Sequence, residues 1–309
     1  MARWASLVEQ RRGERPVLLI DTGDFYPARP MANQEIKDRY FFKAVTLLRY
    51  DAIGIGEYET RNGARRIMEA VERRRLPFVS TNIMEKDSGK RIAAPFRIRT
   101  FGERRTVFGR TGGWRVGVFS VVRPEFVYGF GDNPAKDYYV VDAKIAALEA
   151  VNRLRGRGCS LIVAISHQGW DKSVELAGDV PGIDIVINAH WSHGLTYGKR
   201  VGKTLVIDPG QRETSFTEIE VTFKPNFPEI IASARCGSLL KNPGDPRFLK
   251  LEADFAKEMR AAQMRTARGG TAPGDTTKRR AAPVDTTRHG ATAADAPQRG
   301  DSTAQRQVP

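Results

Sequence analysis

Short apolar segments alternate with amphipathic helical segments in the amino-terminal part of the chain, and this alternation restricts the fold more than any other feature. Hydrophobic periodicity and helix start signals separate the two kinds of segment. A strand, a helix and a further strand in succession predict parallel pairing, with helices covering the faces of the sheet. The expected elements are helices at 2–12, 33–49 and 62–75 and strands at 17–21, 51–56 and 78–83.

The middle of the chain is less regularly interrupted and predicts the antiparallel part of a mixed sheet. The segments PFRIRTF (95–101) and WRVGVFSVV (114–122) follow one another without a helical segment between them. After them the alternation of helix and strand returns. The remaining expected elements are helices at 142–156, 171–177 and 247–264 and strands at 160–166, 183–189, 204–210 and 215–223.

The length of the chain is compatible with one large α/β domain. It has 309 residues, of which 40% are hydrophobic, and α/β domains of roughly 200 to 250 residues are common. No apolar run approaches the ~18 residues that a transmembrane helix needs. We expect a globular domain over residues 1–225, a carboxyl-terminal extension with a polar helix over 226–265, and a tail over 266–309.

The tail differs sharply in composition from the rest of the chain. Residues 266–309 contain no Leu, Ile or Phe and are rich in Gly, Pro, Thr, Ala and charged residues. Such a segment cannot bury enough apolar surface to offset the entropy lost on ordering. We therefore expect a disordered basic tail.

The net charge of +14 invites a search for an anionic partner. The basic residues are scattered among acidic ones on expected helix faces, with no interleaved aromatic platform. This distribution favours a solvated basic surface that attracts a small phosphorylated substrate, and no specific nucleic-acid partner is expected. The alternative is polyanion binding through the basic surface and tail, which would depend steeply on salt.

Polar residues with ligand chemistry follow several of the expected strands. His167, His190 and His193 end consecutive strands, and Asp24 and Glu57 end two earlier ones. Since parallel strands deliver their carboxyl ends to one edge of a sheet, these five side chains can converge. Imidazole and carboxylate ligands together suit zinc, manganese or iron more than calcium.

The order of these residues resembles the calcineurin-like metallophosphoesterase superfamily, and its 5'-nucleotidase branch in particular. Six blocks spanning residues 1 to about 225 carry the resemblance. It implies an α/β fold, a metallophosphoesterase-like sandwich of two mixed β-sheets flanked by helices, followed by the disordered carboxyl-terminal tail. The blocks are IDTGDFY, LRYDAIGIGEYETRNG, LPFVSTNI, the segment 140–171, PGIDIVINAHWSH and GKTLVIDPGQRETSFTEIEV.

In that family two divalent metals, about 3.5 to 4 Å apart, activate a water that attacks phosphorus. Asp24 corresponds to the carboxylate that bridges the metals, and His167 to an imidazole ligand of the second metal. His190 and His193 correspond to the histidines of the last motif, although two residues separate them where the family has one. The resemblance therefore implies one or two divalent ions, zinc, manganese or iron, as the cofactor.

The second motif departs from the family pattern. Glu57 stands where the family has a metal-binding Asn, and Tyr58 where it has a catalytic His. A carboxylate preserves an oxygen ligand, but a phenol of pKa about 10 donates only a weak hydrogen bond where imidazole transfers protons near neutral pH. The resemblance predicts a phosphoesterase that uses metal-activated water. The alternative is a catalytically degenerate member that binds a metal or a phosphorylated ligand.

Two features of the ends bear on this expectation. The family normally begins with a strand carrying Asp-x-His, which has no counterpart after Met1. A start that lies upstream behind a signal peptide would place the protein in the periplasm or outside the cell. Without an upstream start, the expected location is the cytoplasm. Without the Asp-x-His strand, the expected number of metal ions is one. Nucleotide-hydrolysing members also carry a further carboxyl-terminal domain, so nucleotide selectivity is not implied.

Overall fold

The structure is a computed structural model. It describes residues 1–25, 32–60, 68–69, 71–72, 75–102, 104–106, 109–128, 138–190, 197–209, 215–223, 228–229 and 235–267. By its internal contacts the chain divides into Met1–Met264 and Arg265–Pro309. All the described strands lie in the first of these units.

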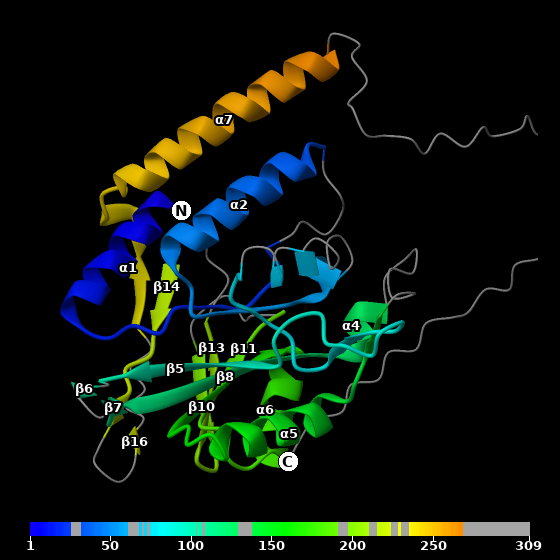
Figure 1. The fold of residues 1–309 in the computed structure, drawn as a ribbon, viewed down its shortest axis with the longest axis vertical. Helices are drawn as coiled ribbons and strands as arrows, with labels where there is room; N and C mark the ends of the chain where they lie inside the picture. Colours follow the sequence, from blue (N-terminus) through cyan, green and yellow to red (C-terminus); the bar gives the residue numbers. More distant parts are fainter. Residues whose placement is uncertain are drawn as a thin grey trace, which may run out of the picture. The chain divides into compact units, whose positions relative to one another are not determined.

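Two β-sheets form the centre of Met1–Met264 (Figure 1). The smaller has the order β1-β2-β3, and its described strands are all parallel. The larger has the order β12-β13-β11-β10-β8-β5; its four inner strands are parallel and its two edge strands antiparallel, as in the predicted mixed sheet. The bounds are β1 Ile20–Asp21, β2 Ala52–Gly54, β3 Phe78–Val79, β5 Phe96–Phe101, β8 Trp114–Val122, β10 Leu161–His167, β11 Ile185–Asn188, β12 Tyr197–Val201 and β13 Thr204–Asp208.

The two sheets pack face to face through an apolar layer. Ala52 and Val79 of the smaller sheet meet Val118, Val163 and other side chains of the larger one. All seven residues of β10 are buried. A strand buried on both faces carries a continuous apolar run, which is why LIVAIS was recognisable as a central strand.

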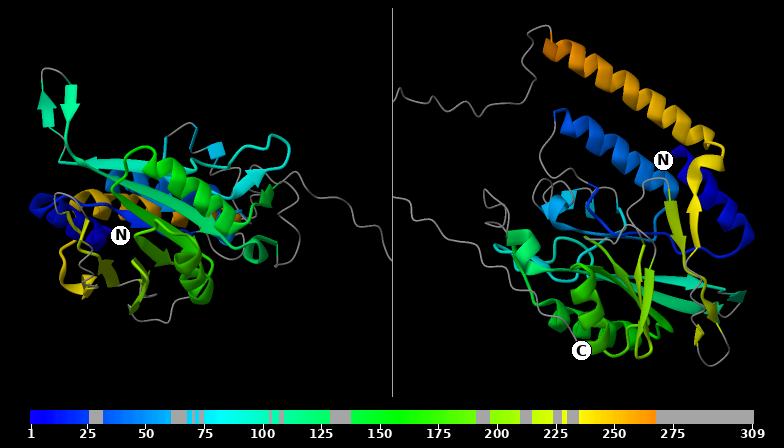
Figure 2. Two further views of the ribbon diagram at one scale, coloured as in Figure 1. Left: turned by 90° about the horizontal axis from the view of Figure 1, so that it is seen from below. Right: turned by 180° about the vertical axis from the view of Figure 1, so that it is seen from behind.

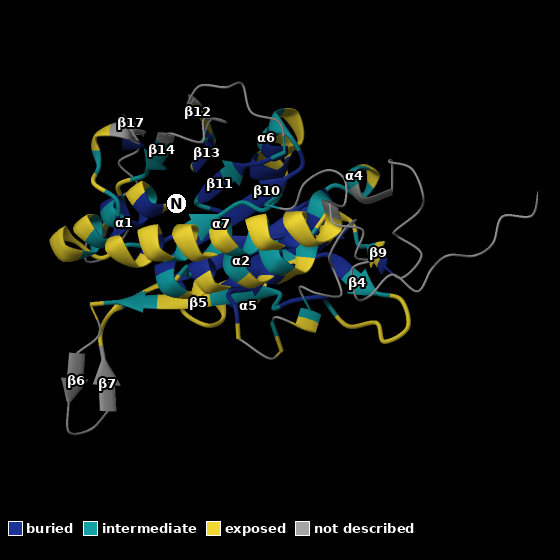
Figure 3. Cartoon of the chain, turned by 90° about the horizontal axis from the view of Figure 1, so that it is seen from above, coloured by how far each residue is buried: buried dark blue, intermediate teal, exposed yellow. Residues whose placement is uncertain are grey.

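Helices cover the outer faces of both sheets (Figure 2). α5 (Ala143–Arg155) and α6 (Trp170–Asp179) pack on the larger sheet through a cluster that includes Leu154 and Phe119. α1 (Ala2–Glu14) and α2 (Gln34–Leu48) supply the clusters beside the smaller sheet. The central strands are buried, whereas the helices expose one side (Figure 3). The result is a sandwich of the predicted class.

The segment after residue 225 packs against this sandwich. β17 (Arg235–Ser238) pairs with β14 (Ser215–Glu218), and α7 (Pro246–Ala267) buries Phe248 against α1 and α2. Tyr40 of α2 also contacts Phe255 of α7. The predicted polar helix therefore exists, and the predicted domain boundary at 225 stays a prediction.

Short elements complete the described part of the chain. They are β4 Ile83–Glu85, β6 Arg104–Thr106, β7 Gly109–Thr111, α4 Pro124–Tyr128, β9 Tyr138–Val140, β15 Thr222–Phe223, β16 Pro228–Glu229 and a 3₁₀ turn at Leu239–Lys241. Among the described helices, none combines the length and hydropathy that crossing a bilayer requires.

Several predicted elements differ in detail. The strands expected at 78–83 and 215–223 are each divided into two, and β12 was not predicted. The helix expected from 62 falls largely outside the described residues, while residues 57–60 are already helical. Of the predicted disordered tail, the first two residues belong to α7, and 268–309 lie outside the described residues.

Candidate metal centre

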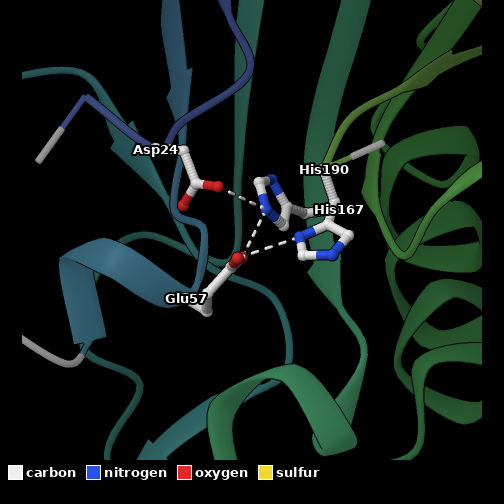
Figure 4. A group of neighbouring side chains, drawn as sticks. All are labelled: Asp24, Glu57, His167 and His190. Carbon is white, nitrogen blue, oxygen red and sulfur yellow. Dashed lines mark hydrogen bonds and ion pairs between the residues drawn. The ribbon is translucent and has the colours of Figure 1, made fainter. Parts of the chain in front are cut away.

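Asp24, Glu57, His167 and His190 meet at one edge of the sheets (Figure 4). One ligand atom from each lies within 4.8 Å of the ligand atoms of the other three. The four residues follow or end β1, β2, β10 and β11, and thus come from the carboxyl ends of parallel strands. The convergence expected from the strand order is therefore present for these four. His193 lies outside the described residues.

Two of the four residues have a left-handed backbone. Asp24 has φ 61° and follows Gly23 at φ 92°, while His190 has φ 82°. Few non-glycine residues adopt this conformation, and Asp, Asn and His do so more readily than most. Such positions cluster at functional sites and persist only where surrounding contacts fix them.

Glu59 supplies one of these contacts. Its carboxylate is fully buried, and one oxygen accepts hydrogen bonds from the backbone N–H groups of Asp24 and Gly56, both at 2.7 Å. Since residues 57–60 form a helical turn, Glu59 occupies the position from which a glutamate reaches back to the helix start. Glu59 was not among the predicted site residues, and the sequence signal for it is a glutamate three residues after Gly56.

His167 is held between two carboxylates. Its Nε2 lies 2.7 Å from Glu57 Oε2 and 3.1 Å from Asp24 Oδ2, and its Nδ1 lies 3.3 Å from the carbonyl oxygen of Thr22. Burial works against protonation, but hydrogen bonds to Asp24 and Glu57 outweigh it and raise the pKa of His167 to about 10. A second ring nitrogen on a backbone carbonyl is the arrangement that orients metal-ligating histidines.

His190 carries an unsatisfied buried nitrogen. Its Nδ1 lies 2.9 Å from Glu57 Oε1, yet it has no hydrogen bond of acceptable geometry. The ring stacks on Phe126, with centroids 3.6 Å apart and an interplanar angle of 20°. A buried polar atom without a hydrogen bond is costly and calls for an explanation. A cation shared with the neighbouring carboxylates would provide that missing partner.

Glu57 is the central carboxylate of the cluster. It is 1% exposed, with one oxygen facing His167 and the other facing His190. Burial favours its neutral form, but the contacts with these two histidines prevail and hold the pKa of Glu57 far below its usual range. One oxygen from each of two carboxylates and one nitrogen from each of two imidazoles form a donor set that fits zinc and similar divalent ions. The residues present therefore fit the predicted cofactor class.

The Tyr58 side chain packs against the apolar cluster that contains Phe42 and Ile53. Its backbone N–H donates a hydrogen bond to Asp24 Oδ1 at 3.1 Å. Through this bond Tyr58 helps to fix the Asp24 carboxylate. The catalytic role expected at its position stays a prediction.

The protonation of His167 predicts how the stability of the metal-free protein depends on pH. Its pKa rises on folding from 6.5 to about 10, so its contribution is fully present below the unfolded pKa and is lost as pH rises through the folded one. The free energy of unfolding should therefore fall between about pH 6.5 and 10. Urea denaturation in EDTA at a series of pH values across this interval measures the free energy of unfolding. Equal pH dependence in wild type and His167→Gln would contradict the assignment.

Sequence comparisons find relatives among nucleotide phosphoesterases, although no family model matches the chain. It is 26% identical over 219 residues to a 2',3'-cyclic-nucleotide 2'-phosphodiesterase/3'-nucleotidase of Salmonella typhimurium, covering 64% of this chain and 33% of that protein. It is 29% identical over 213 residues to a 5'-nucleotidase of Homo sapiens, covering 66% of this chain and 34% of that protein. The chain thus spans about a third of the length of these curated relatives.

Among solved structures, the fold matches a 5'-nucleotidase precursor from Thermus thermophilus. The TM-score is 0.69 at 20% identity, over 83% of this chain and 53% of the other. This likeness confirms the fold class predicted from the sequence.

Proposed function

We propose, from the resemblance of the chain to the 5'-nucleotidase branch of the calcineurin-like phosphoesterases in sequence and fold, that it is a metal-dependent phosphoesterase. The proposal rests on one observation above all, the convergence of Asp24, Glu57, His167 and His190, of which Glu57 and His167 are buried. The names of the relatives add the substrate class. We take that substrate to be a small phosphate ester, with nucleoside monophosphates and 2',3'-cyclic nucleotides as its first candidates.

The four converging residues would hold one divalent ion. Asp24 and Glu57 would supply oxygen ligands, and His167 and His190 nitrogen ligands. When bound, such an ion polarises a phosphoryl oxygen and lowers the pKa of a coordinated water. His193 is a candidate ligand of a second metal ion. Tyr58 is a candidate donor of a hydrogen bond to the substrate.

The remaining structure keeps the ligands in place. Glu59 fixes the turns that carry Asp24 and Glu57. Phe126 covers one face of the His190 ring, and the guanidinium of Arg123 lies 5.4 Å from the Phe126 ring centroid. His167 holds a proton in the metal-free protein and must release it to bind a cation, so we expect metal binding to be accompanied by proton release.

Hydrolysis of p-nitrophenyl phosphate and bis(p-nitrophenyl) phosphate tests the proposal. We expect turnover after loading with Mn²⁺ or Zn²⁺, none in EDTA, and a loss of at least about 100-fold in Asp24→Ala, since even outer-shell changes cost 10- to 100-fold. Asp179→Ala is the matched control, because that carboxylate is exposed and pairs with Lys144. Metal binding without turnover of any ester would instead support the degenerate, ligand-binding alternative.

A further inference from the structure

A cavity lies at the opposite ends of the strands that lead to Asp24 and Glu57. It has a volume of about 570 Å³ and opens beside residues 16–18, which precede β1, and residues 49–51, which precede β2. Asp24 and Glu57 lie beyond the other ends of these same strands. The cavity is therefore separate from the metal centre.

The walls of this cavity are strongly basic. Five arginines line it, Arg12, Arg15, Arg49, Arg97 and Arg99, and we name it the arginine pocket. Among the lining residues that the structure describes, Asp51 is the one carboxylate. A group of arginines around a cavity attracts anions wherever the protein's own carboxylates do not pair with them.

Four of these five arginines are engaged with the protein itself. Arg12 and Arg49 both pair with Glu9, at 3.0 Å, and Arg15 lies 3.7 Å from Glu220. Arg12 donates to the carbonyl oxygens of Leu48 and Arg49, at 2.7 and 2.8 Å, which fixes it in the wall. Asp51 accepts the backbone N–H of Leu19 with one oxygen and faces Arg99 with the other, at 3.4 Å. These carboxylates offset the charge of four of the five arginines, and Arg97 is the one left over.

Arg97 is the residue that most needs a partner. Its guanidinium has no hydrogen bond or ion pair within the described part of the chain, although the side chain is half-buried. Burial lowers the pKa of Arg97, and the charge of Asp51 only partly opposes this. A half-buried cation without a close anion is costly to the folded protein. A bound anion would remove that cost.

The pocket also has an apolar floor. Arg97 stands directly opposite Val118 in the pairing of β5 with β8, and Phe101 lies on the same face of β5 because side chains alternate along a strand. Leu18, Phe101 and Val118 all line the cavity. Its volume falls in the range of roughly 300 to 1,000 Å³ that is usual for small-molecule sites.

We propose that the arginine pocket binds a small organic phosphate, with the phosphate groups between Arg97 and Arg99 and an apolar moiety on Leu18, Phe101 and Val118. Guanidinium groups pair bidentately with phosphate oxygens, and the floor gives the remainder of the ligand an apolar contact. The proposal does not depend on the phosphoesterase activity, because it uses none of the residues of the metal centre.

Equilibrium dialysis of the full chain against labelled ADP tests this assignment in EDTA and at low salt. We expect saturable binding of ADP by wild type and by Asp24→Ala. In Arg97→Gln the affinity should fall about 10-fold, because a charged hydrogen-bonding group is lost. In the double variant Arg97→Gln with Arg99→Gln, binding should be undetectable. Pyrophosphate, which has no apolar moiety, should compete poorly. The control Arg260→Gln changes an exposed arginine that, within the described residues, donates to Ala256 of its own helix. Absent binding by wild type, or unchanged binding by the double variant, would overturn the proposal.

Thermal unfolding without ligand gives an independent readout. Arg97→Met keeps a long side chain and removes the charge, so we expect it to melt above wild type and to lose the stabilisation by ADP that wild type shows. A lower melting temperature for Arg97→Met would mean that the protein already compensates the guanidinium, and would refute the argument for a missing anion.

Discussion

Replacing Glu57 with alanine is expected to abolish metal binding and to destabilise the metal-free protein by about 3–5 kcal/mol. Glu57 faces His167 with one oxygen and His190 with the other. Its removal leaves the imidazoles of His167 and His190 without the anion that they share. A bound cation would also lose the carboxylate that lies nearest both of its nitrogen ligands. Breaking a buried charged pair on one side costs more than removing the pair, because the remaining charge stays uncompensated.

Two measurements separate the effects on metal and on folding. Calorimetric titration with Zn²⁺ gives the affinity, and urea denaturation in EDTA gives the free energy of unfolding. Glu57→Gln is the informative companion, because it keeps the shape and an oxygen ligand while it removes the charge; we expect it to fold better than Glu57→Ala and to bind metal more weakly than wild type. Wild-type metal affinity in Glu57→Ala would exclude Glu57 as a ligand.

Gly56→Ala is expected to disrupt the centre without changing any ligand. A Cβ at position 56 would lie 2.6 Å from Cε1 of His167 and closer still to Asp24 Oδ1. Neither neighbour can yield easily, since His167 is 1% exposed and the Asp24 turn is fixed by Glu59. We expect a loss of stability of about 1–3 kcal/mol, as overpacking of a core costs, together with a loss of metal affinity of at least about 10-fold.

Gly178→Ala provides the matched control for the added methyl group. Its Cβ would meet only Val201 Cγ1, at an ordinary 3.6 Å, and the position lies within α6. Alanine is favoured over glycine inside a helix, so this variant should be as stable as wild type or more so. Equal Zn²⁺ affinity of Gly56→Ala and Gly178→Ala would contradict this prediction. It would show that the close approach of the Gly56 backbone to Asp24 and His167 is not needed for metal binding.

The larger sheet was predictable because two of its inner strands, β8 and β10, are long and mostly apolar. β10 carries the continuous apolar run LIVAI, β8 is apolar at six of its nine positions, and the alternation with helices indicates parallel pairing. β12 was missed because TYGKRV lacks an apolar pattern and becomes a strand only by pairing with β13. The strand expected at 78–83 ends early because Ser80 donates its N–H group to Ala94 and Thr81 to Ser120 of β8, so neither continues the pairing of β3 with β2. Tertiary contacts decided both cases.

The site was predictable as far as its position in the fold. Side chains at the carboxyl ends of parallel strands must face one edge, which brings Asp24, Glu57, His167 and His190 together. Which atoms meet could not be read from the sequence. The stacking of Phe126 on His190 depends on where α4 lies against the loop after β11. No residue spacing encodes that contact.

The left-handed backbone at Asp24 and His190 limits how this centre could be transplanted. If only the four side chains were copied onto another scaffold, Asp24 and His190 would still need a left-handed backbone, which few non-glycine residues adopt. The recipient would also need a glycine before the aspartate, and a buried carboxylate to anchor that turn, as Glu59 does here. The smallest unit that could be transferred is therefore the two loops that carry Asp24 and Glu57, together with the Glu59 hydrogen bonds that join them.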